Sequence, residues 1–156
     1  MLSSDILEQQ FGPTELVIVS QNKKHRTIQT IATQSHAVLE LSVVSFDRMN
    51  TILFPEIHEQ ILQGSSMGRA FKNAAVDFFR DVHFISHSAV PANIQTIFTN
   101  QNAATIIDVD ILIGPDKIHY CHITEIYNPI VVWPISSKPR SLNVEQALRQ
   151  ISKMLK

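Results

Sequence analysis

Apolar and polar residues alternate along several short stretches of the chain, which is the pattern of half-buried β-strands. The longest alternation follows the turn signal Gly114-Pro115-Asp116 and ends at Asn128-Pro129. A strict period of two places one set of residues on the same face: His119, Cys121, Ile123, Glu125 and Tyr127. Glutamate is depleted from strands and is costly to bury alone. Glu125 therefore either faces water or lies in a pocket that needs a charge.

The same alternation predicts further strands, at residues 16–20, 25–33, 37–46, 78–86, 94–98 and 105–113. Polar turns join the first three of these strands, which favours an antiparallel meander. Helical spacing of apolar residues and residues suited to helix ends predict helices at 6–11, 55–62, 67–74 and 143–155. Strands interrupted by a few helices indicate an α+β fold with an antiparallel sheet.

Length and composition narrow the class of protein. At 156 residues we expect one domain, with a core over about 3–134 and an appended C-terminal helix over about 143–155. The net charge is −1 and the basic residues are scattered, which argues against a nucleic-acid-binding face. We find no signal peptide and no apolar run long enough to span a membrane. The sequence therefore predicts a soluble cytoplasmic protein.

Seven histidines and one cysteine are candidates for metal or nucleophilic chemistry. The side chains of His83 and His87 are four residues apart and would lie together on a helix, but their segment is predicted to be a strand. His119 and His122 face opposite sides of a strand and cannot converge without a bulge. We therefore expect no metal site. Cys121 lies in an apolar strand without a neighbouring cation, which is typical of an inert core thiol.

Two further patterns each allow a structural and a functional interpretation. The small-residue turn 65–69 enters a helix and either caps it or binds an anion with its backbone N–H groups. We expect Arg26 and Glu125 to lie on neighbouring strands. They are either ordinary surface charges or a pair in which arginine holds a carboxylate and glutamate moves a proton.

Six short motifs, read together, resemble the chorismate lyase family, whose members convert chorismate to 4-hydroxybenzoate and pyruvate. The similarity spans roughly residues 3–129. The motifs are residues 4–12, His25-Arg26-Thr27-Ile28, Leu41-Ser42-Val43-Val44, Ser66-Met67-Gly68-Arg69-Ala70-Phe71, Phe79-Arg80-Asp81-Val82 and Thr124-Glu125-Ile126-Tyr127-Asn128-Pro129.

This resemblance implies a sheet of about six strands flanked by helices, an internal ligand cavity, and a lyase that needs no cofactor. It implies that Arg26 holds a substrate carboxylate and that Glu125 is the proton-transfer group or binds the ring hydroxyl. The backbone around Met67 is expected to cap the ligand, and Arg69 or Arg80 to meet a second carboxylate. For Arg80 the alternative is an ordinary surface or ion-pair residue. The expected partner is a small aromatic or cyclohexadiene carboxylic acid. The oligomeric state stays open.

Two departures from the family pattern place negative charge where the family has positive charge. Glu40-Leu41 stands in place of Gly-Arg or Ala-Arg, and Asp108-Val109-Asp110 replaces a basic strand. Chorismate is a dianion, so these carboxylates would repel it if they lined the cavity.

The alternative function is therefore a non-catalytic small-molecule binding or sensor domain of the same fold. Glu40 or Asp108 in the cavity would favour it, and both residues in solvent would favour the enzyme. The fold also serves as the effector-binding domain of some bacterial transcription regulators. Those proteins carry an upstream DNA-binding domain, for which this chain is expected to be too short. A third alternative is an interaction protein whose terminal helix docks a partner.

Overall fold

The structure is a computed structural model that describes residues 3–132. These residues form the helices α1 (Ser3–Phe11), α2 (Arg48–Thr51), α3 (Pro55–Leu62), α4 (Met67–Asn73) and α5 (Ala92–Ile97). They also form the strands β1 (Thr14–Gln21), β2 (His25–Ala32), β3 (Val38–Phe46), β4 (Phe78–Ala89), β5 (Ala103–Ile113) and β6 (Ile118–Tyr127). The predicted α+β class is confirmed. The helix predicted over 143–155 and the predicted end of the core at 133–134 lie outside the described residues.

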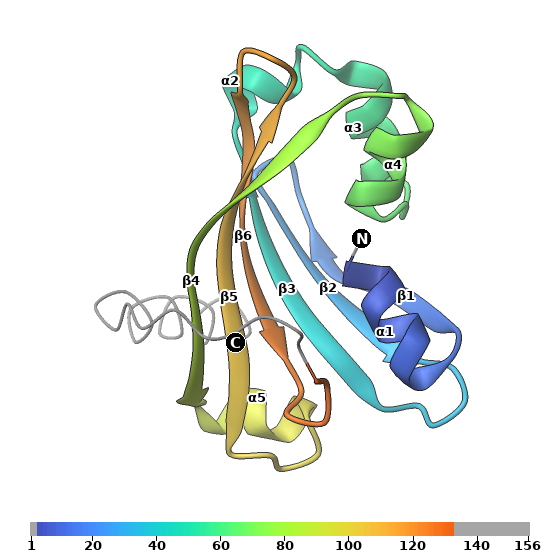
Figure 1. The fold of residues 1–156 in the computed structure, drawn as a ribbon, viewed down its shortest axis with the longest axis vertical. Helices are drawn as coiled ribbons and strands as arrows, with labels where there is room; N and C mark the ends of the chain where they lie inside the picture. Colours follow the sequence, from blue (N-terminus) through green and yellow to red (C-terminus); the bar gives the residue numbers. More distant parts are fainter. Residues whose placement is uncertain (1–2, 133–156) are drawn as a thin grey trace.

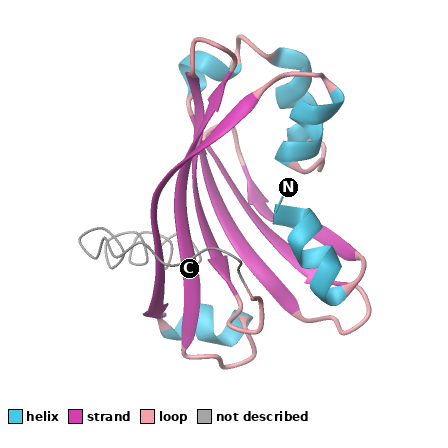
Figure 2. Ribbon diagram, viewed as in Figure 1, coloured by secondary structure: helices cyan, strands magenta, loops and turns pink. Residues whose placement is uncertain are grey.

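All six strands of this region form one antiparallel sheet, in the order β1-β2-β3-β6-β5-β4 (Figures 1 and 2). The first three strands are neighbours in sequence and in space, so the predicted meander is confirmed. The chain then crosses through α2, α3 and α4 to the far edge of the sheet. From there β4, β5 and β6 lead back to β3, which brings early and late parts of the sequence side by side.

Each face of the sheet packs its own apolar cluster. On one face, Leu7 of α1, Ile61 of α3 and Phe71 of α4 pack in the same cluster as strand residues such as Val109. On the opposite face, α5 packs through Ile94 and Phe98. Figure 1 shows α1, α3 and α4 on the same side of the curved sheet, with a space between α1 and the two other helices.

The segment 94–98 was predicted as a strand, and this prediction is wrong. It belongs to helix α5, whose N-cap is Pro91. Ile94 and Phe98 lie four residues apart and are both fully buried, which is the spacing of one helical face. A stretch as short as Ile-Gln-Thr-Ile-Phe fits either period, and the preceding proline was the signal for a helix start.

Strand β6 also departs from the predicted strict alternation. Its register with β5 shifts between Cys121 and His119, so that Tyr120 is the extra residue of a β-bulge. Tyr120 and Cys121 both belong to the cluster beneath α3 and α4. His119 lies instead with His122, where both contact Asp110. The prediction that His119 shares a face with Cys121 is therefore wrong.

The helix ends follow the capping residues of the sequence. Ser66 is the N-cap of α4 and accepts a hydrogen bond from the Arg69 N–H. Asp47 caps the short helix α2, which the sequence pattern did not predict. Gly12 follows α1 with a φ of 76°, a conformation that favours glycine. Within residues 3–132, no helix is long and apolar enough to cross a membrane.

Candidate ligand-binding cavity

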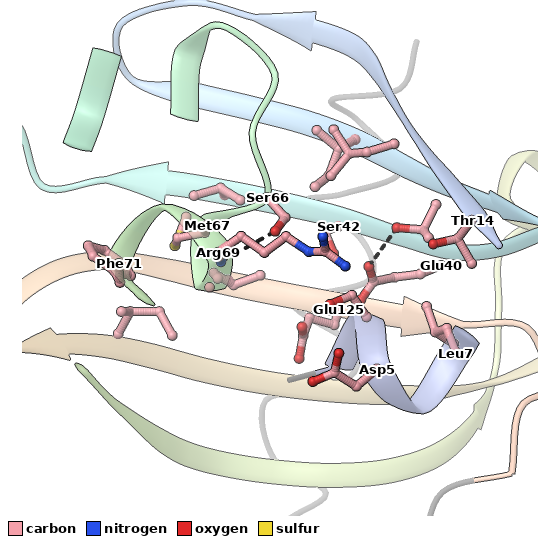
Figure 3. A pocket seen from close by; sticks show the side chains of 18 of the residues that line it. Asp5, Leu7, Thr14, Glu40, Ser42, Ser66, Met67, Arg69, Phe71 and Glu125 are labelled. Atoms are coloured by element: carbon pink, nitrogen blue, oxygen red, sulfur yellow. Dashed lines mark hydrogen bonds between the residues drawn. The ribbon is translucent and has the colours of Figure 1, made fainter. Parts of the chain in front are cut away.

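A cavity of about 620 Å³ lies between the sheet and helices α1 and α4 (Figure 3). This volume is within the range of small-molecule binding sites. Much of its wall is apolar, with Leu7 from α1, Phe71 from α4 and Ile28, Val44 and Ile123 from the strands. Such a wall suits the ring or hydrocarbon part of a small organic molecule.

The residues that the sequence analysis selected as site residues all line this cavity: Arg26, Met67, Arg69, Arg80 and Glu125. The sheet register explains part of this convergence. Ile28 of β2 lies opposite Ser42 of β3, which lies opposite Glu125 of β6. Strand β3 therefore separates the strands of Arg26 and Glu125, and the prediction that these two strands are neighbours is wrong. Because residues two apart share a face, Arg26 on β2 faces the same cavity. Their proximity agrees with the predicted roles, and the roles themselves stay predictions.

Arg26 is buried at the cavity wall, with 1% of its surface exposed. One terminal nitrogen, Nη2, donates a hydrogen bond to the Ser65 carbonyl oxygen at 3.3 Å. Its Nε has no hydrogen-bond partner among the described residues. Burial lowers the pKa of this side chain, but a guanidinium remains charged in proteins. A buried cation with an unused donor is a position where a ligand carboxylate would be stabilised.

Glu125 is already paired within the protein. Its two carboxylate oxygens accept hydrogen bonds from Arg80 at 2.5 and 3.4 Å. Glu125 is buried, whereas a third of the Arg80 side chain is exposed. Arg80 is therefore engaged by Glu125 and is not a free partner for a second ligand carboxylate.

Glu40 brings a second buried carboxyl group to the same cavity, and Figure 3 shows it near Glu125. Burial and then the nearby charge of Glu125 raise the pKa of Glu40 to about 7, although hydrogen bonds from Tyr127 and Thr30 favour the charged form. The Thr30 Oγ1 donates to Glu40 Oε1 at 3.2 Å. Glu40 can therefore gain or lose a proton near neutral pH.

Met67 and Arg69 approach the cavity from α4. The Arg69 side chain is exposed and lies 3.5 Å from Glu8 of α1, so this ion pair connects the two helices beside the cavity. No local pattern indicates a role for Glu8, because its partner is distant in sequence. Ligand capping by the backbone around Met67 stays a prediction, as does anion binding by residues 65–69. The Ser66 hydroxyl there caps the seven-residue helix α4.

Cys121 belongs to the apolar core and does not line the cavity. Its thiol is buried and 3.5 Å from the Met67 sulfur. Burial raises the pKa of this thiol well above its ordinary value. A buried thiol of high pKa is a poor nucleophile, so the expectation of an inert core cysteine agrees with its surroundings.

The two departures from the family pattern have different positions. Glu40 lines the cavity, which favours the sensor alternative. Asp108 does not, because it lies on the opposite face of the sheet, where it contacts His122 and Thr124. One of the two unusual acidic segments therefore adds negative charge to the cavity.

Comparison with known proteins adds information on the fold. No protein-family model and no curated protein matches the sequence. The structure is similar to a GntR-family transcriptional regulator from Bacillus cereus, with a TM-score of 0.55 and 8% identity over 81% of this chain and 99% of that chain. The C-terminal domain of Yurk from Bacillus subtilis has a TM-score of 0.47 and 13% identity over 78% and 89% of the two chains. At these identities, the likeness to the B. cereus protein shows a shared α+β fold.

Proposed function

We propose that the cavity binds a small organic acid and that the chain acts as a ligand-binding or sensor domain. The observation that carries this proposal is the buried Arg26, whose Nε is without a partner in the described part of the chain. A ligand carboxylate would pair with this guanidinium once a rotation of the side chain turns Nε toward the cavity, and the apolar wall would contact the rest of the molecule. The protein of similar fold from B. cereus is described as a transcriptional regulator, which supports a sensor more than an enzyme. A cytoplasmic location and a single domain over residues 1–156 are parts of the same proposal.

The cavity charges favour a monocarboxylate over a dianion. Arg80 is paired with Glu125, and Arg69 with Glu8. Arg26 is left as the buried cation that can receive a ligand. Glu40, once ionised, would repel a second negative charge on the ligand. An aromatic monocarboxylate such as 4-hydroxybenzoate therefore fits these charges better than chorismate.

Chorismate lyase activity is the second candidate function. Ionised Glu40 would repel the dianion chorismate, but its pKa of about 7 also provides a protonated form, which could act as an acid in the same cavity as Arg26 and Glu125. A group that exchanges a proton near neutral pH is suited to general acid–base catalysis. The reaction eliminates pyruvate from chorismate and makes the ring aromatic, so it needs proton transfer and exclusion of water rather than a redox cofactor.

Calorimetric titration with 4-hydroxybenzoate tests the binding proposal. We expect saturable binding to the wild-type chain, and no binding of 4-hydroxybenzyl alcohol, which lacks the carboxylate. Arg26→Met should weaken 4-hydroxybenzoate binding about 100-fold, because a hydrogen-bonded charge pair is lost. Lys24→Met is the matched control, since it removes one exposed positive charge on the β1–β2 turn, outside the cavity lining. Equal affinities of the Arg26 and Lys24 variants would contradict the proposal.

Incubation with chorismate, followed by chromatography, separates the two candidate functions. Binding of 4-hydroxybenzoate without turnover of chorismate would support the sensor. Formation of pyruvate and 4-hydroxybenzoate, lost in Glu40→Gln or Glu125→Gln, would support the lyase and identify its acid.

A further inference from the structure

A second group of polar side chains lies on the face of the sheet opposite the cavity. It consists of three histidines and four aspartates, called here the His/Asp cluster: Asp47, Asp81, His83, Asp108, Asp110, His119 and His122. Asp108 and Asp110 alternate along β5 with Val109 and Ile111, which belong to the apolar cluster on the cavity side. The His/Asp cluster therefore shares the sheet with the cavity but not its face.

Two β-bulges bring the histidines together. In β4 the register with β5 shifts between Val82 and Phe84, so that His83 is the extra residue. In β6 the bulge at Tyr120 places His119 on the same face as His122. β-Bulges re-aim side chains, and they are frequent beside functional sites. Here the bulged strands flank β5 on both sides, and each directs histidine toward the carboxylates of β5.

Asp110 is the centre of the contacts within the cluster. Its Oδ2 lies 2.6 Å from His83 Nε2, and its Oδ1 lies 2.9 Å from His119 Nε2 and 3.0 Å from His122 Nδ1. The second ring nitrogen of His122 lies 2.8 Å from Asp108 Oδ1, and that of His119 lies 3.1 Å from Asp47 Oδ2. Both histidines thus direct both ring nitrogens at carboxylate oxygens.

This arrangement calls for additional positive charge. A neutral imidazole has one N–H group and can donate to only one of its two carboxylate neighbours. In the described part of the chain, the aspartates of the cluster form ion pairs with histidines and with no lysine or arginine. The missing charge is supplied either by a second proton on each ring or by a metal cation that takes the place of a proton.

The ligand atoms lie close enough together for one cation to take the place of these protons. The potential ligand atoms of His83, Asp108 and His122 all lie within 4.8 Å of one another. Ligands of a tetrahedral zinc ion are about 3.3 Å apart, given metal–ligand distances of about 2.0–2.1 Å. Small rotations of side chains close this difference, and the His83 and His122 side chains are 40% and 39% exposed, which leaves room for rotation and a path for an ion.

We propose that the His/Asp cluster binds one divalent transition-metal ion, with His83, Asp108 and His122 as its protein ligands. Two imidazoles and a carboxylate suit zinc and its first-row neighbours rather than calcium or magnesium. Asp110 contacts both ligand histidines and orients their rings, as carboxylates beside metal-bound histidines do. The ion would link β4 to β6 across β5.

Calorimetric titration of the metal-free chain with Zn²⁺, after removal of any histidine tag, tests this proposal. We expect one ion per chain. His83→Ala, His122→Ala and Asp108→Asn should each weaken binding by at least about 10-fold. His87→Ala is the matched control: it lies on the same strand as His83, is exposed, and contacts Thr105 rather than the cluster. Its Zn²⁺ affinity should equal that of the wild type.

The outcomes are separable. Co²⁺ bound in the wild type should give the visible absorption of a coordinated site, and His83→Ala and His122→Ala should lose it. Circular dichroism of the metal-free variants checks that they fold, and the two histidine changes alter half-exposed side chains. Absence of saturable binding would mean that the cluster is a network of protonated histidines and aspartates, and would overturn the proposal. Equal weakening in His87→Ala would overturn it too, because it would indicate adventitious binding to surface histidines.

Discussion

Arg80 reaches from β4 across β5 to Glu125 on β6, where its two terminal nitrogens contact the two carboxylate oxygens at 2.5 and 3.4 Å. This pair compensates the charge of a glutamate that is almost fully buried. It also engages an arginine that the family resemblance assigned to a second substrate carboxylate. Arg26 is therefore the buried cation of the cavity that no carboxylate of the described residues engages.

Removal of Arg80 should destabilise the fold. Arg80→Ala leaves Glu125 buried without its cation, and we expect a loss of about 3 kcal/mol in the free energy of unfolding, measured with urea. The double variant Arg80→Ala/Glu125→Gln should recover part of this loss. Arg69→Ala, which breaks the exposed pair with Glu8, should cost less than about 1 kcal/mol. Equal losses in the two arginine variants would show that the Arg80–Glu125 pair has no special role.

Glu40 should make the stability of the fold depend on pH. Its pKa rises from 4.5 to about 7 on folding, so the folded state binds the extra proton between these values. The contribution of protonated Glu40 to the free energy of unfolding is fully present below about pH 4.5. It is lost as the pH rises to about 7, and its total is about 3 kcal/mol. Glu40→Gln should remove this pH dependence. The variant should therefore exceed the wild type in stability by more at pH 8 than at pH 5. The exposed Glu15→Gln is the control. Parallel pH profiles of wild type and Glu40→Gln would contradict this assignment.

Arg26→Met should separate stability from binding. The substitution removes a buried charge that has no carboxylate partner among the described residues and replaces it with an apolar chain. We therefore expect the unfolding free energy without ligand to stay constant or to rise by about 1–4 kcal/mol. Stabilisation by 4-hydroxybenzoate should disappear at the same time. A loss of more than about 2 kcal/mol without ligand would indicate that Arg26 supports the fold rather than a ligand.

Cys121 should resist alkylation in the native protein, because its thiol is buried and its pKa is raised. Mass spectrometry after iodoacetamide treatment should show an unmodified native chain and a fully modified chain in guanidinium. Native labelling at the rate of a free thiol would restore Cys121 as a candidate nucleophile.

Local patterns predicted most elements of the fold. The alternation of 25–33 and the Ser65-Ser66 cap before Met67 each had a structural counterpart, because strand periodicity and helix capping depend on neighbouring residues. The strand prediction for residues 94–98 was wrong because it also depended on a local pattern alone. Five residues are too few to separate the two periods, and burial against the sheet decided between them.

The sites depend on contacts that no local pattern contains. The pairing of Arg80 with Glu125 requires the strand order, which places β5 between them. The convergence of His119 with His122 requires a bulge at Tyr120, and a bulge is a property of two paired strands rather than of one sequence segment. The family resemblance, and not the periodicity, selected Arg26 and Glu125 as members of one site.

A crystal structure of the protein with 4-hydroxybenzoate is the sharpest test of the proposed binding cavity. We expect the ligand inside the cavity between α1, α4 and the sheet, with its carboxylate paired with the Arg26 guanidinium and its ring against the apolar wall. A carboxylate bound at Arg69 outside the apolar wall, or a cavity that stays free of ligand at saturating concentration, would contradict it.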